Sequence, residues 1–178
     1  MLTFSLQNSG TVKVVNGGKK LVVFPDKPDP KLDLSLMAHS EEEPGEGVIS
    51  WPGEYDFDGL SVRGIGHGEG DKVSFVIDVD YVRCAFLASP LEELSDHILE
   101  LLGDIDVLFL PADDAKLGQK IIDQLDPRAL IPLEMKDKDA YSDLLDKCGA
   151  KGNSPEKEFK VKGRGGLRAE GREVVVLK

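Results

Sequence analysis

The chain has 178 residues, is 40% hydrophobic and carries a net charge of −11. This length and composition fit one packed domain, and we expect residues 1–178 to form it. No run approaches the ~20 apolar residues of a membrane-spanning helix, and the first residues lack a signal-peptide pattern, so we expect a cytoplasmic protein without membrane contact. The acidic balance argues against nucleic acid as a partner, because phosphate binding needs clustered Lys and Arg.

The charge is unevenly distributed along the chain. Residues 151–178 contain eight Lys and Arg against four Asp and Glu, which leaves 14 against 29 and a balance of −15 for residues 1–150. We interpret residues 155–178 as a basic, β-rich C-terminal segment that packs on an acidic body; a polyanion-binding tail is the alternative. Cys84 and Cys148 show no CxxC spacing and are expected to be reduced, packed thiols.

The first half of the chain has the pattern of antiparallel strands. The segments TVKVV and KLVVF flank a Gly-rich turn, and EYDFDGLSVRGIG alternates on either side of Asp58-Gly59. The segment VSFVIDVDYVRCAFLA predicts a further pair of strands around Asp80-Tyr81. Four or more antiparallel strands follow from these patterns.

The hydrophobic period changes after Ala88. Residues 89–103, SPLEELSDHILELLG, predict a helix with Ser89 as N-cap, Pro90 as first residue and Glu92 completing a capping box. DVLFLP and RALIPL predict buried strands, and residues 113–126 and 138–149 predict two amphipathic helices.

The C-terminal residues 158–178 alternate again and predict strands. Within them, GRGGLR (163–168) predicts a hairpin turn, with a backbone anion nest beside two arginines as the alternative. The whole order of elements indicates two packed sheets with helices outside.

Three segments carry a resemblance to a known family: WPGEYDFDGLSVRGI, EELSDHILELLGDIDVLFLPA and IIDQLDPRALIPLEMKD. Together they resemble the metallo-β-lactamase superfamily, in particular its branch of predicted zinc-dependent hydrolases similar to L-ascorbate-6-phosphate lactonases. The resemblance covers roughly residues 2–136 and implies an α/β (α+β) fold, the four-layer αββα sandwich. Family members hold two divalent ions with imidazoles and a bridging carboxylate.

The positions that resemble the family's metal ligands carry few ligands here. In HSEEEP, His39 falls on the first histidine of the metal loop and Glu41 on the second. His67 suits a further histidine, whereas Ser89 replaces the bridging aspartate and Glu134 replaces the final histidine. The segments QNSG (7–10) and FPD (24–26) stand where relatives carry two further polar motifs.

The residues themselves lead to the same interpretation. No second His or Cys lies at ligand spacing around any of the three histidines, and His97 falls within a helix where exposure is expected. We therefore predict no metal and no catalytic residue, with Glu41–Glu43 in an acidic, solvated loop. A degenerate pocket formed by His39, Glu41, His67, Ser89 and Glu134 is the predicted ligand site.

The sequence thus favours a metallo-β-lactamase-fold pseudoenzyme with a binding or structural role and no cofactor. The alternative is an atypical metal-dependent hydrolase that holds manganese, zinc or magnesium in a mixed site of His39, Glu41, His67 and Glu134. The pattern identifies no partner, and a homo-oligomer stays open.

Overall fold

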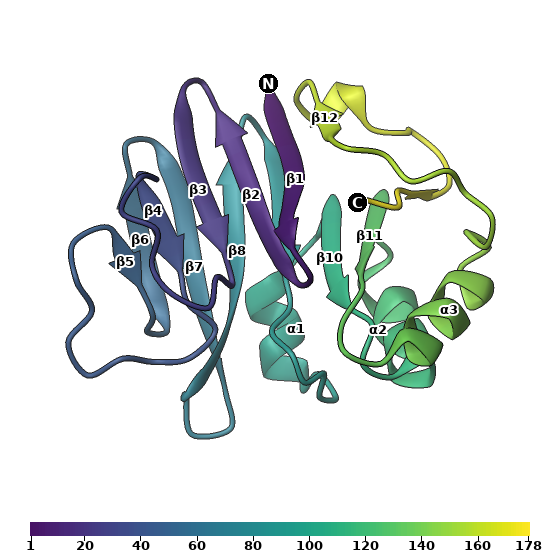
Figure 1. Cartoon of the computed structure of the whole chain (residues 1–178), viewed down its shortest axis with the longest axis horizontal. Coiled ribbons are helices and arrows are strands. Elements are labelled where there is room, and N and C mark those ends of the chain that lie inside the picture. The colour runs from purple at the N-terminus through teal and green to yellow at the C-terminus, as the bar shows by residue number, and fades with distance from the viewer.

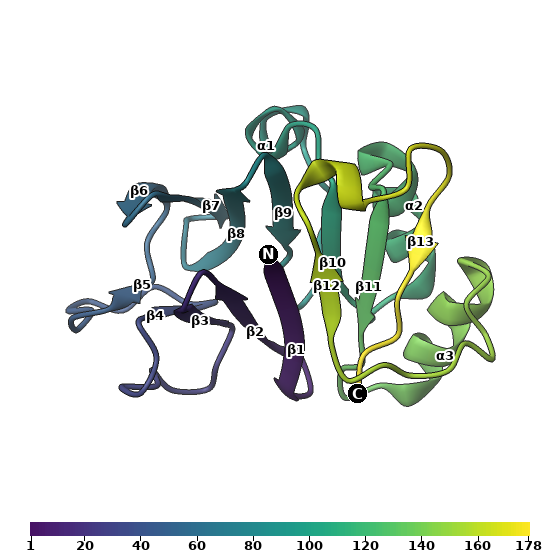
Figure 2. The ribbon, with the colours of Figure 1, turned by 90° about the horizontal axis from the view of Figure 1, so that it is seen from above.

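The computed structural model describes all residues, 1–178, and places two mixed β-sheets face to face (Figures 1 and 2). One sheet has six strands in the order β12-β1-β2-β3-β4-β5. Its bounds are β1 Leu2–Asn8, β2 Thr11–Asn16, β3 Lys19–Val23, β4 Leu34–Leu36, β5 Val48–Ile49 and β12 Phe159–Val161. Within it β1, β2, β3 and β12 pair antiparallel, while β3, β4 and β5 run parallel.

The second sheet has seven strands in the order β13-β11-β10-β9-β8-β7-β6. Its bounds are β6 Gly53–Phe57, β7 Leu60–His67, β8 Lys72–Val79, β9 Val82–Phe86, β10 Val107–Pro111, β11 Ala129–Leu133 and β13 Glu173–Val174. The strands β6 to β9 form an antiparallel meander, whereas β9, β10, β11 and β13 run parallel. The parallel strands therefore bring their carboxyl ends to one edge of the sheet.

The three helices are α1 Asp96–Leu102, α2 Ala115–Leu125 and α3 Lys138–Lys147. They pack on the outer face of the seven-stranded sheet, because Leu102, Ile121 and Leu144 are buried in one cluster with outward residues of β8, β9, β10 and β11. No helix occurs before β9, so the six-stranded sheet has no helical cover. The α/β fold with two packed sheets predicted from the sequence is confirmed; its helices cover one outer face, so the structure has three layers where the resemblance implies four. None of the helices has the length and hydrophobicity that a membrane span needs.

The main core lies between the two sheets. It contains 28 buried residues, twice the 14 of the cluster beneath the helices. Phe86 and Phe109 stack with ring centroids 4.4 Å apart, and Phe4 from the other sheet lies 5.0 Å from Phe109. This aromatic contact stabilises the packing of the two sheets, because aromatic rings bury a large apolar area.

The hairpins predicted in the first half of the chain are confirmed, whereas the hairpin predicted at residues 163–168 and the predicted start of the first helix are wrong. Asp58, Asp80 and Tyr81 adopt positive φ angles of 50°, 51° and 62° at the expected turns. The helix predicted at residue 89 begins at Asp96, with the Ser95 hydroxyl accepting the Ile98 N–H. Residues before it form a loop instead of a helical turn.

The C-terminal segment adds one strand to each sheet. A 3₁₀ turn, Arg164–Gly166, stands where the sequence predicted a hairpin turn, and β12 and β13 on either side of it belong to different sheets. The arginine Nε of Arg164 donates to Oδ1 of Asp106, which is 3% exposed, over 3.0 Å. Arg172 Nη2 donates to Asp126 over 2.8 Å. These two contacts join arginines of the C-terminal segment to carboxylates earlier in the chain.

Candidate functional site

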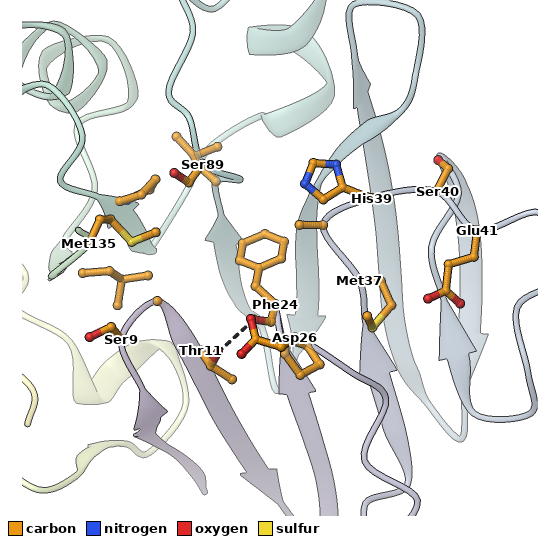
Figure 3. A pocket seen from close by; sticks show the side chains of 16 residues that line it. Ser9, Thr11, Phe24, Asp26, Met37, His39, Ser40, Glu41, Ser89 and Met135 are labelled. Carbon is orange, nitrogen blue, oxygen red and sulfur yellow. Dashed lines mark hydrogen bonds between the residues drawn. The ribbon is translucent and has the colours of Figure 1, made fainter. Parts of the chain in front are cut away.

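A cavity of about 410 Å³ opens where strand ends of the two sheets meet (Figure 3). The six-stranded sheet contributes the β1–β2 turn (9–11), the residues after β3 (24–26) and the residues after β4 (37–41). The seven-stranded sheet contributes residues at the carboxyl ends of its parallel strands, namely Leu87, Ser89, Pro111, Leu133 and Met135. Such an edge is where α/β sheets commonly bind ligands, because loops from several strands converge there.

Backbone hydrogen bonds to both sheets fix the loop that carries His39. The Met37 N–H donates to the carbonyl of Ile49 over 2.9 Å, and the carbonyl of Ala38 accepts the N–H of Val73 over 2.8 Å. Ser40 Oγ then donates to the carbonyl of Gly70 over 2.9 Å. The loop therefore bridges the sheets, and the exposed His39 ring lies beside the cavity.

Glu41, at the end of this loop, is also held by its backbone. Its N–H donates to Ser50 Oγ over 3.1 Å, and its carbonyl accepts the indole N–H of Trp51 over 2.6 Å. The side chain is partly buried and lines the cavity, whereas Glu42 and Glu43 are exposed. The solvated acidic loop expected from the sequence is thus observed for two of its three glutamates.

The ring of Phe24 forms the middle of the cavity wall, with His39 to one side and Met135 to the other (Figure 3). Its N–H donates to the carbonyl of Leu36, and its own carbonyl accepts the Thr11 hydroxyl, both over 2.8 Å. Phe24 has a φ of 59°, a left-handed conformation that costs a non-glycine residue about 1–2 kcal/mol. These two hydrogen bonds hold the backbone of Phe24 in this strained conformation.

The proton of the Ser89 hydroxyl is directed to Asp113. Ser89 Oγ lies 2.9 Å from both carboxylate oxygens of Asp113, and one of these oxygens also accepts the Leu91 N–H over 2.9 Å. The Ser89 hydroxyl is hydrogen-bonded to a carboxylate and not to an imidazole, so the arrangement differs from the Ser–His pair of a serine nucleophile. Asp113 also explains why the helix does not begin at Ser89 as predicted, because its carboxylate holds residues 89–91 as a loop.

His67 lies outside this cavity, buried at the start of the β7–β8 turn. Its Nε2 is 2.7 Å from Ser74 Oγ, and its Nδ1 has no hydrogen-bond partner. Burial lowers the pKa of His67, the nearby positive charge of Lys72 lowers it further, and Glu92 acts in the opposite direction. The Lys72 ammonium is itself neutralised by Glu92, 2.7 Å away, and donates to the carbonyl of Pro90 over 2.6 Å.

Glu134 lines a second cavity, of about 360 Å³, together with Tyr141. Burial raises the pKa of Tyr141, and the negative charge of Glu134 adds to this effect. Met135, the next residue, lines the first cavity instead. Successive side chains of an extended chain point to opposite faces, which explains why these neighbours enter different cavities.

The structure thus brings His39, Glu41 and Ser89 to one cavity and keeps His67 and Glu134 apart from it. No group of three or more His, Cys, Asp or Glu side chains is arranged to hold a metal ion. A site for two divalent ions needs several imidazoles and a bridging carboxylate, and the cavity offers a single imidazole. The donor set does not fit the dinuclear centre that the resemblance implies.

The sequence interpretation missed several residues of the cavity, above all Thr11, Phe24, Asp26 and Met135. The segments 7–10 and 24–26, which the resemblance marks only as replaced polar motifs, both contribute lining residues. A usable signal was their position directly after strand patterns, since residues at strand ends line the edge of a sheet.

Comparisons with known proteins identify the fold. No family model matches the chain. A search of curated proteins finds 27% identity over 119 residues to the aspartate carbamoyltransferase catalytic subunit of Methanococcus aeolicus. That match covers 65% of this chain and 36% of the relative, so it spans about a third of the relative's length.

Several solved structures match 90% or more of the chain. The first, assigned to the Zn-dependent hydrolases of the metallo-β-lactamase superfamily from Thermotoga maritima, has a TM-score of 0.79 at 22% identity and covers 99% of this chain and 98% of its own. The metallo hydrolase Igni18 of Ignicoccus hospitalis has a TM-score of 0.65 at 14% identity, covering 90% and 99%. YhfI of Bacillus subtilis, a metallo-β-lactamase-fold protein, has a TM-score of 0.62 at 9% identity, covering 99% and 96%. This chain therefore has the metallo-β-lactamase fold.

Proposed function

We propose that this metallo-β-lactamase-fold protein binds a small organic molecule in the cavity beside His39 and has no hydrolase activity. One observation carries the proposal: the cavity at the edge of both sheets is built from apolar and polar side chains, while His67 and Glu134, two of the positions that resemble metal ligands, lie outside it. A volume of about 410 Å³ falls within the range of small-molecule sites.

The arrangement of the cavity supports binding without chemistry. Phe24 and Glu41 are held by hydrogen bonds to their backbones, so the wall is formed before a ligand arrives. Preorganisation of this kind lowers the entropy lost on binding. The hydroxyl of Ser89, engaged by Asp113, retains its lone pairs as acceptors for a ligand.

An atypical metal-dependent hydrolase is the second candidate, and the description of two fold neighbours as a Zn-dependent hydrolase and a metallo hydrolase favours it. Metal analysis of protein purified without chelator separates the two candidates. We expect less than about one tenth of an equivalent of zinc or manganese, since a working metalloenzyme retains its ion. Near-stoichiometric metal that is lost in His39→Ala would overturn the proposal in favour of the hydrolase.

Binding is tested with three probes that share a phenyl body: 2-phenylethylamine, 2-phenylethanol and 3-phenylpropionate. We expect at least one of them to bind in calorimetry with a Kd below about 1 mM. Ser9→Trp should block binding, because the exposed Ser9 lines the cavity. Asn8→Trp is the matched control, since Asn8 lies outside this cavity. Failure of all three probes to bind would reject the proposed function.

A further inference from the structure

We propose that the cavity selects a cationic amine with an apolar body. The inference rests on the proposed binding function and assigns the chemical class of its ligand. It follows from three features of the lining residues: the sign of their charges, the apolar wall around Phe24 and the lack of a free positive charge.

The charged groups that line the cavity are acidic. Asp26 and Glu41 contribute carboxylates, and no Lys or Arg is among the lining residues. Figure 3 shows Asp26 next to the ring of Phe24 and Glu41 at one end of the cavity. The carboxylate of Asp113 adds negative charge behind the Ser89 hydroxyl. The field of the site therefore attracts a cation, as does the net charge of −11 on the whole chain.

The ammonium group of Lys72 lies near this site. It donates to the carbonyl of Pro90, the residue after Ser89, which lines the cavity. Its side chain is 8% exposed and its Nζ lies 2.7 Å from Glu92 Oε1, so its charge is already compensated. An anionic ligand would find no unpaired partner there. It would lose hydration beside two carboxylates without a compensating charge, which disfavours its binding.

The apolar part of the wall suits the body of an organic amine. Phe24 presents its ring, and Met37 and Met135 contribute thioether side chains next to it. An aromatic face attracts an ammonium group through its quadrupole, and polarisable methionines adapt to an apolar body. A bare inorganic cation would use the carboxylates and leave this wall unused.

The three phenyl probes distinguish this inference from the proposed function. We expect 2-phenylethylamine to bind about ten-fold more tightly than 2-phenylethanol, and 3-phenylpropionate to bind more weakly than both, since ion pairs with the exposed Asp26 and the partly buried Glu41 contribute modestly. Asp26→Asn should weaken the amine about five-fold and leave the alcohol unchanged. Glu42→Gln is the matched control, because Glu42 is exposed and does not line the cavity.

Two results overturn the inference while leaving the proposed function intact. One is an alcohol or a carboxylate that binds as tightly as the amine. The other is unchanged amine affinity in both Asp26→Asn and Glu41→Gln, with circular dichroism showing that each variant is folded. Absence of binding by all three probes rejects the proposed function itself.

Discussion

Ser74 provides the sharpest test of how the site is supported. It is 1% exposed on β8, and its Oγ accepts the Ala88 N–H over 2.9 Å and lies 2.7 Å from His67 Nε2. Ser74→Ala removes both hydrogen bonds and leaves both partners buried. A net hydrogen bond contributes about 1 kcal/mol, and an unsatisfied buried partner costs about 1–3 kcal/mol. We expect the free energy of unfolding to fall by about 2–4 kcal/mol, and Tm by about 5–15 °C.

Urea unfolding followed by circular dichroism measures this loss. Ser61→Ala is the control, because Ser61 is exposed on the neighbouring strand β7 and its loss should stay within about 0.5 kcal/mol. Since Ala88 precedes Ser89, Ser74→Ala should also weaken ligand binding in the cavity. A Ser74→Ala protein as stable as Ser61→Ala would refute the view that this hydroxyl supports the end of β9.

Two further changes test other parts of the site. Gly10→Ala should cost more stability than Gly17→Ala: both glycines have positive φ, but a Cβ at Gly10 would lie 3.1 Å from Met135 Sδ, and one at Gly17 meets nothing within 4 Å. Equal losses in urea unfolding would contradict this contact. The buried His67 should make the protein sensitive to acid. Its pKa in the folded protein lies below the usual 6.5, so the unfolded chain binds more protons than the folded protein once the pH falls below about 6.5. Thermal scans should show full stability above about pH 7 and a loss of stability toward pH 5. This loss should be smaller in His67→Gln and unchanged in His97→Gln, because His97 is exposed. Equal losses in the two variants would exclude His67 as the cause.

Local patterns predicted most of the fold. The turn at Asp58-Gly59 and the buried strand β10 follow from short-range rules, because turn residues and apolar runs act over a few positions. The start of α1 does not, since Asp113, far along the chain, fixes the loop at Ser89 and leaves Ser95 as the cap. The separation of β12 and β13 into two sheets likewise depends on pairing that a local pattern does not contain.

The candidate site was predictable only in part. His39, Glu41 and Ser89 could be placed near one another through a family resemblance, and they line one cavity. His67 and Glu134 carry ligand-type side chains at suitable positions, but His67, at the end of β7, and Glu134, directly after β11, do not line this cavity. A shift of one residue in the pairing of a strand turns each of its side chains to the opposite face, and short sequence motifs do not define the pairing to that accuracy.

The pairing of Leu2 with Val161 and Phe4 with Phe159 joins positions that lie almost a whole chain apart. During synthesis, the outer edge of β1 has no partner until residues 159–161 have left the ribosome. Contacts of this separation slow folding, because a long loop must close before they form. The nascent chain therefore holds an open β-edge until residues 159–161 emerge, and the second sheet is completed only when residues 173–174 follow.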